Sequence, residues 1–160
     1  MQYITGRKVT QECTVESVDS SGSKGRTYRM SPEQASNAAT ISAVGTSRGM
    51  PERAVTIALA TALQESGLRN IEHGDRDSLG LFQQRPSQGW GTAEQILDPV
   101  YSAAEFYRHL AEVPGYSRLS LTVAAQRVQH SDSQAYAKHE PDAALLAAAL
   151  TGRTPAALNC

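Results

Sequence analysis

The chain has 160 residues and a mass of 17.2 kDa, which is the size of one folded domain. Apolar residues make up 40% and charged residues 19%, and the formal net charge is −1, so the composition excludes a disordered chain and gives no electrostatic reason to expect nucleic acid as the partner. The longest apolar run, residues 143–150, is far shorter than the roughly 20 residues that a membrane-spanning helix needs.

The first thirty residues predict a short hairpin or arm that packs on the rest of the domain. Two stretches of β-forming residues, 13–18 and 26–30, flank a turn rich in Ser and Gly at residues 20–25. Residues 1–12 contain no apolar core of the kind found in a signal peptide. We therefore expect any export signal or membrane anchor to be absent from this chain.

Residues 31–160 predict one helical domain. Ser31-Pro32-Glu33-Gln34 combines an N-cap, a proline at the first helical position and a Gln three residues after the cap, and it predicts a helix that runs to Val44. Caps and apolar spacing predict further helices over residues 51–67, 98–113, 120–129 and 142–150. The expected fold class is mainly α, with about five to seven helices and a short N-terminal hairpin (α+β).

One long aperiodic loop, residues 68–91, interrupts the helical pattern. It is dense in Gly, Asp, Ser and Gln. Loops of this length inside a compact domain are usually functional, so we look for the site here and at the helix end that precedes it.

The two cysteines, Cys13 and Cys160, lie near the two ends of the chain. They belong to no spacing typical of zinc ligands. They are either two unrelated thiols or one disulfide that ties the ends of the domain together, and we favour the disulfide. A disulfide would indicate an oxidising compartment, outside the cell or in its envelope.

Glu65 lies in the last turn of an apolar helix, just before a stop at Gly67. The negative end of the helix dipole disfavours a charged carboxylate at such a position. A carboxylic acid that keeps its proton is what cleavage of a glycosidic bond requires as proton donor. A solvated surface charge is the alternative for a lone Glu at a helix end.

Glu65-Ser66, followed about fifteen residues later by Gly80-Leu81-Phe82-Gln83, resembles the ES…GLMQ pattern of soluble lytic transglycosylases and goose-type lysozymes. Gly74-Asp75-Arg76 also resembles the GDR segment that precedes GLMQ in the goose type. The similarity covers roughly residues 50–130. It implies a lysozyme-like fold and cleavage of the β-1,4 bond of peptidoglycan.

The resemblance implies a role for each matched residue. Glu65 would be the general acid, and Ser66 would orient it or bind the N-acetyl group of the sugar, unless its hydroxyl only caps a helix carbonyl. Asp75 would help to position an attacking water, with Asp77 as a second candidate and a simple turn aspartate as the alternative. The residues expected to contact or approach substrate are Ser66, Gly80, Phe82, Gln83, Gln84, Trp90 and Gln126.

Two of these residues carry alternatives from the sequence itself. Trp90, between glycines, is either a platform on which a sugar stacks or a buried loop anchor. The transglycosylases place a tyrosine in a downstream Ala-Tyr-Asn segment, which residues 124–129 match best, so that Gln126 takes the place of the tyrosine. Gln126 or Gln129 could then be the partner of the acid, and a polar helix face is the alternative.

The sequence leaves two mechanisms open. Arg85 stands where goose-type enzymes place a further Asp, so an inverting hydrolase would depend on Asp75. A lytic transglycosylase needs a single acid, because the N-acetyl group and the C6 hydroxyl of the sugar complete the reaction and leave a 1,6-anhydro product. We favour the single-acid mechanism.

We expect no metal and no cofactor. The histidines are scattered and no metal-binding or nucleotide-binding fingerprint is present. The expected partner is the glycan strand of peptidoglycan, with no nucleic acid and no evident protein partner, and we expect a monomer. Two other functions remain open: a peptidoglycan-binding module of the same fold that does not cut, and a helical interaction domain in which the motif is a coincidence.

Overall fold

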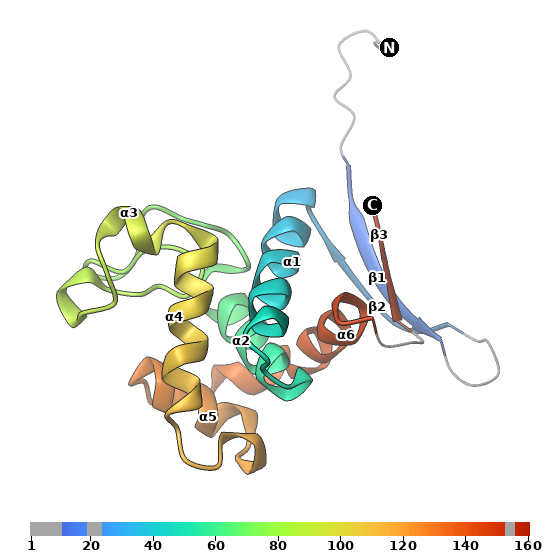
Figure 1. Ribbon diagram of the computed structural model, residues 1–160. Helices are drawn as coiled ribbons and strands as arrows, with labels where there is room; N and C mark the ends of the chain where they lie inside the picture. Colours follow the sequence, from blue (N-terminus) through green and yellow to red (C-terminus); the bar gives the residue numbers. More distant parts are fainter. Residues whose placement is uncertain (1–10, 19–23, 153–155) are drawn as a thin grey trace, which may run out of the picture.

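The computed structural model describes residues 11–18, 24–152 and 156–160, and these residues form a helical body with a small sheet at its side (Figure 1). The mainly α class with a minor β part is confirmed. No helix in the described ranges is both long and apolar enough to cross a membrane. In chain order the elements are β1 (Cys13–Val18), β2 (Lys24–Met30), α1 (Pro32–Ser47), α2 (Glu52–Ser66), η1 (Pro86–Gln88), α3 (Ala93–Ile96), α4 (Pro99–Ala111), η2 (Tyr116–Arg118), α5 (Leu121–Gln129), η3 (Ala135–His139), α6 (Glu140–Leu150) and β3 (Ala156–Asn159).

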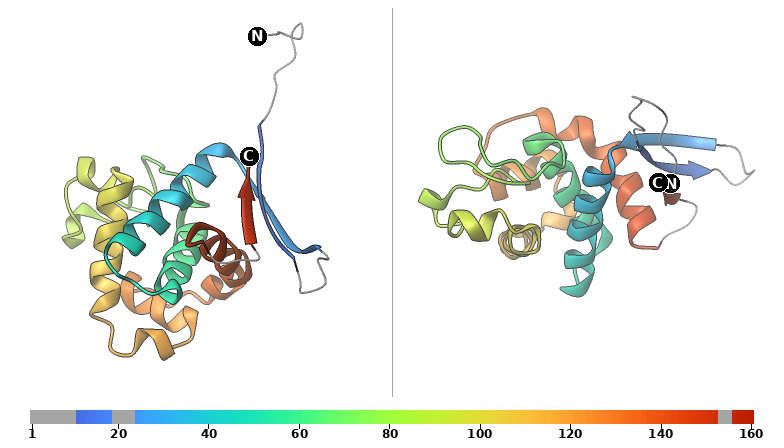
Figure 2. Two further views of the ribbon diagram at one scale, coloured as in Figure 1. Left: turned by 45° about the vertical axis from the view of Figure 1, so that its right-hand side comes forward. Right: turned by 90° about the horizontal axis from the view of Figure 1, so that it is seen from above.

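Helix α2 is the centre of the core. Every residue from position 54 to position 63 is buried, and α1, α4, α5 and α6 all contact this helix (Figures 1 and 2). A helix that is apolar on all sides must be covered on all sides. The buried hydroxyl of Thr61 is satisfied within the helix, since it donates to the carbonyl oxygen of Ile57 at 2.7 Å. The last turn of α2 is thereby fixed in position, and it carries Glu65.

The predicted start of α1 is confirmed, with a complete capping box. The Gln34 amide N–H donates to Ser31 Oγ at 3.1 Å, and the Ser31 N–H donates to Gln34 Oε1 at 2.8 Å. Gln34 Nε2 also donates to the carbonyl oxygen of Gly67 at 2.8 Å, so the start of α1 holds the end of α2. The helix continues to Ser47, past the predicted end at Val44, because the buried Gly45 packs against α4 and α2.

The sheet has the strand order β2-β1-β3 and is antiparallel. The hairpin of β1 and β2 is confirmed, while residues 1–10 of the expected arm and residues 20–23 of its turn lie outside the described residues. Strand β3 was not predicted; it pairs with β1 through partners such as Thr14 and Asn159. The disulfide between Cys13 and Cys160 is confirmed and lies beside this pairing. Because β1 and β2 come from the N-terminal part of the chain and β3 from the C-terminal part, the sheet holds residues 11–18 and 24–30 next to α6 (Figure 2).

Candidate functional site

The carboxyl group of Glu65 is held at the end of α2 by two side chains from distant parts of the chain. Its Oε2 accepts a hydrogen bond from the Tyr136 hydroxyl at 2.7 Å and a second from Gln129 Nε2 at 3.2 Å. Glu65 is half-buried, and no donor among the described residues bonds its Oε1. One oxygen is therefore fixed and the other is left available.

Tyr136 is the partner of Glu65 that sequence reasoning missed. The interpretation that the chain lacks a tyrosine for the acid is wrong, because η3 brings Tyr136 onto Glu65. Gln126, placed in that role from the sequence, instead donates through Nε2 to the carbonyl oxygen of Ser133 at 2.8 Å. Tyr136 lies outside residues 124–129, to which the downstream segment was matched, and 71 residues from Glu65.

The Tyr136 hydroxyl is a buried hydrogen-bond donor. The residue is only 1% exposed, and burial, with a smaller contribution from Glu65, raises the pKa of Tyr136 well above its ordinary value. A protonated phenol donates a hydrogen bond, and such a bond to a carboxylate oxygen is stronger than one between neutral groups. Tyr136 therefore fixes the position of Glu65 Oε2 as a hydrogen-bond donor.

A second pair of side chains ties η3 to the same turn of α2. His139 Nε2 lies 2.9 Å from Gln64 Oε1, so the neutral ring donates to the side chain that precedes Glu65. Burial, together with the charge of Lys138, lowers the pKa of His139. Gln64 and Glu65, which are adjacent in α2, thus both form hydrogen bonds with residues of η3, and the position of Tyr136 depends on both bonds.

We expect mild acid to lower the stability of the protein through His139, because the charged ring is disfavoured where it is partly buried beside Lys138. The unfolded chain takes up a proton on His139 near pH 6.5, whereas the folded protein does so at a lower pH, so the stability gained from the neutral ring is complete above about pH 6.5 and is lost as the pH falls. The melting temperature of the wild type should fall more between pH 7.5 and pH 5 than that of His139→Gln, which still has a donor for Gln64. Equal decreases in the two proteins would contradict this role.

The motif Gly80-Leu81-Phe82-Gln83 forms a tight turn between the ends of α2 and α5. Leu79 and Gln84 close it with two backbone hydrogen bonds of 2.9 and 3.0 Å. Gly80 has φ +78°, and a Cβ there would lie 3.0 Å from the carbonyl oxygen of Ile96, so both the conformation and the space require glycine.

Two polar side chains fasten this turn to the helices. Ser66 Oγ donates to the Leu81 carbonyl oxygen at 2.8 Å, and Gln129 Nε2 donates to the Phe82 carbonyl oxygen at 2.8 Å. Ser66 thus takes the helix-end role that was its alternative, with the turn as its partner. The Phe82 ring is fully buried and stacks on Phe106, so only its backbone faces the site.

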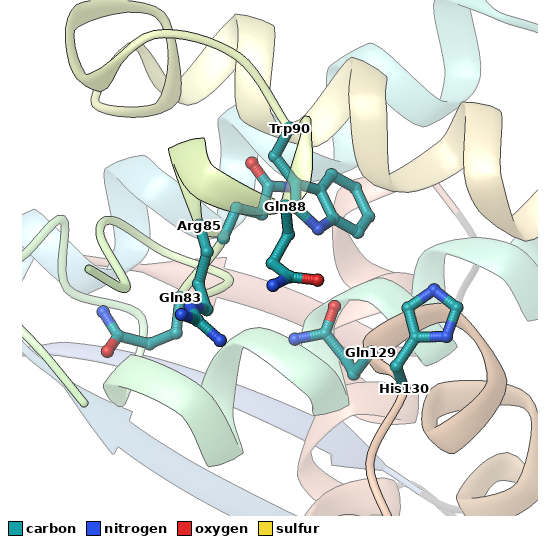
Figure 3. Close-up of a pocket in the computed structure, with 7 residues that line it drawn as sticks. Gln83, Arg85, Gln88, Trp90, Gln129 and His130 are labelled. Carbon is teal, nitrogen blue, oxygen red and sulfur yellow. The ribbon is translucent and has the colours of Figure 1, made fainter. Parts of the chain in front are cut away.

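The side chain of Gln83 connects two parts of the loop that follows α2. Its Nε2 donates to the carbonyl oxygens of His73 at 3.2 Å and Gly80 at 3.1 Å, and Figure 3 shows its amide turned away from Gln129. Gly74 packs directly under this amide, where a Cβ would overlap Gln83 Oε1. The GDR-like and GLMQ-like segments are therefore in contact, and the expected direct bond from Gln83 to substrate has no support in this arrangement.

The candidates for a second catalytic carboxylate lie in different surroundings. The side chain of Asp75 is 95% exposed, and its ion pair with Arg76 is long, at 4.0 Å. Asp77 accepts from Arg85 Nε at 2.6 Å and from the Ser87 N–H at 2.8 Å, and these donors hold the pKa of Asp77 far below its ordinary value. Asp77 is thus a structural anion, and no contact orients Asp75 toward the acid.

A pocket of about 140 Å³ lies beside Gln129 (Figure 3). Trp90 is 7% exposed and packs at 3.9 Å, centroid to centroid, on the ring of His109. One face of the indole is therefore covered, and Trp90 anchors the loop while also contributing to the wall. The lining residues are Gln83, Gln84, Arg85, Gln88, Trp90, Gln129 and His130.

Among the residues that the structure describes, no group of three or more His, Cys, Asp or Glu side chains is arranged to hold a metal ion. No protein-family model and no curated protein matches this chain. The resemblance to transglycosylases and goose-type lysozymes therefore rests on the residues quoted above, and the activity it implies is a proposal.

Proposed function

We propose that this protein cleaves the β-1,4 bond between N-acetylmuramic acid and N-acetylglucosamine in peptidoglycan, with Glu65 as the general acid. It would act as a lytic transglycosylase or a lysozyme-like muramidase. The observation that carries the proposal is the convergence of Tyr136 and Gln129 on one oxygen of Glu65, beside the motif turn and a pocket. The two donors, a buried tyrosine and a half-buried glutamine, come from residues 71 and 64 positions away from Glu65, so distant parts of the chain meet at this one carboxylate.

The arrangement suits a proton donor. Both donors bond Oε2, so the acidic proton of the neutral carboxyl group belongs on Oε1. That proton would pass to the glycosidic oxygen as the bond from C1 to this oxygen breaks, and the carboxylate formed would accept a proton back from the attacking hydroxyl. Tyr136 and Gln129 stabilise the carboxylate that forms between the two transfers.

The surroundings favour the single-acid mechanism. An inverting hydrolase needs a second carboxylate, held about 6.5–9.5 Å from the acid, to activate water. Asp77 is engaged with Arg85, and Asp75 is exposed with no oriented contact. The N-acetyl group and the C6 hydroxyl of the sugar would then complete the reaction, which gives a 1,6-anhydro product.

The disulfide supports a place outside the cytoplasm. A bond between Cys13 and Cys160 persists in an oxidising compartment, and peptidoglycan lies in such a compartment. We propose an extracellular or cell-envelope location and action as a monomer.

Release of soluble muropeptides from purified, insoluble peptidoglycan tests the activity. The wild type should release them in proportion to time and protein, and it should act poorly on chitin, which lacks N-acetylmuramic acid. Absence of release by folded protein would contradict the proposal.

Removal of one hydroxyl tests the role of Tyr136. Tyr136→Phe should lower kcat by about tenfold or more and leave KM nearly unchanged, because a hydrogen bond to a charged group is worth about 1.5–3 kcal/mol. Tyr101→Phe is the matched control, since the Tyr101 hydroxyl donates to a backbone carbonyl oxygen, that of Trp90, at 3.2 Å and not to the carboxyl group of Glu65. Equal kcat values for the two variants would show that Tyr136 does not position the acid.

A further inference from the structure

We propose that the pocket beside Gln129 binds the peptide stem of peptidoglycan through a free carboxylate and a backbone amide. This inference rests on the proposed function, because it names the part of the substrate that the same site takes. Three observations carry it: unpaired acceptors in the pocket wall, an oriented arginine, and the link from the pocket to Glu65.

Gln84 and Gln129 line the pocket, and the amide oxygen of each is buried without a partner among the described residues. Gln84 is 1% exposed, and its Nε2 donates to the Ser102 carbonyl oxygen at 3.0 Å while its Oε1 bonds nothing. Gln129 uses Nε2 on Glu65 and Phe82, and its Oε1 is likewise unpaired. Buried acceptors are almost always paired in folded proteins, so a wall with two unpaired ones indicates a ligand that brings N–H donors.

Arg85 supplies the complementary donors. Its Nε is bound by Asp77 at 2.6 Å, which fixes the plane of the guanidinium group, and neither Nη is bonded to a described residue. Figure 3 shows Arg85 and Gln88 extending from the loop toward Gln129 and His130. A guanidinium group whose Nη edge is free matches the two oxygens of a carboxylate.

The hydrogen bond between Gln129 and Glu65 indicates which part of the substrate reaches the pocket. Gln129 contacts the acid through one end of its amide and lines the pocket with the same side chain. A group in the pocket therefore lies next to the sugar whose bond is cut. N-acetylmuramic acid carries the peptide stem, which has both amide N–H groups and free carboxylates, whereas a bare sugar has no carboxylate to place on Arg85.

Binding to Glu65→Gln, which should not turn over, tests the inference directly. The probes are a peptide-bearing disaccharide with a free carboxylate, the same compound with that carboxylate amidated, and the disaccharide without peptide, measured by calorimetry. We expect the first to bind about tenfold or more tightly than the other two. Addition of Arg85→Gln should remove the difference, and addition of Arg76→Gln, an exposed neighbour in the same loop, should keep it.

Asp77→Ala provides a second variant should Arg85→Gln fail to fold. It retains the arginine charge and releases Nε, so the preference for the free carboxylate should shrink. Equal binding of the three probes to Glu65→Gln overturns the inference even if the wild type cleaves peptidoglycan. A preserved preference in a protein that releases no products supports the pocket and overturns only the proposed cleavage.

Discussion

Glu65→Gln is expected to lower the release of muropeptides by about 10²- to 10⁴-fold, the contribution that a positioned general acid typically makes. The amide has nearly the shape of the carboxyl group, and its oxygen can still accept from Tyr136 and Gln129, so the fold should persist. What the variant loses is the carboxyl group that donates the proton in the proposed mechanism.

Glu72→Gln is the matched control for this experiment. Glu72 is exposed in the loop that follows α2, and the same change of charge there should leave the rate within about twofold. A Glu65→Gln protein that is as active as Glu72→Gln, with an unchanged melting temperature, would remove Glu65 from the mechanism.

Removal of the disulfide is expected to cause the largest loss of stability. The bond closes a sequence separation of 147 residues, and restricting the unfolded chain in this way is worth up to about 5 kcal/mol. It also lies at the pairing of β1 with β3, so the double variant Cys13→Ser/Cys160→Ser should lose the ends of the sheet first. The midpoint of urea unfolding should decrease markedly.

Reductant provides the internal control for that prediction. It should shift the unfolding midpoint of the wild type toward that of the double variant and leave the double variant unchanged. Cleavage by the double variant should persist at low temperature, since no residue that lines the pocket belongs to the sheet. Coincident unfolding curves for oxidised and reduced wild type would contradict the assigned role of the bond.

Local signals in the sequence account for the parts of the fold that were predicted correctly. The capping box at Ser31 and the Asp98-Pro99 start of α4 involve residues within one turn of each other. The hairpin of β1 and β2 is also local. Strand β3 has four residues and gains its partners only when the two chain ends meet, so its own pattern could not reveal it.

In the candidate site, too, local features were predicted from the sequence and long-range contacts were not. Glu65 and the motif turn were found because they form a short, ordered pattern along the chain. Tyr136 lies 71 residues from Glu65, and nothing in its neighbourhood shows that η3 folds back onto α2. The hydrogen-bond partners of Gln83 and Asp77 could not be predicted either, because they depend on the conformation of the loop. Gln83 itself has φ +53° there.

The measurement that tests the central claim most directly is mass spectrometry of the products released from purified peptidoglycan by the wild type and by Glu65→Gln. The account predicts muropeptides one water lighter than hydrolysis products, present with the wild type and absent with the variant. Hydrolysed ends that disappear with the variant would retain Glu65 as the acid and contradict the single-acid mechanism. Folded wild type that binds glycan and yields no products would contradict cleavage and indicate a binding module.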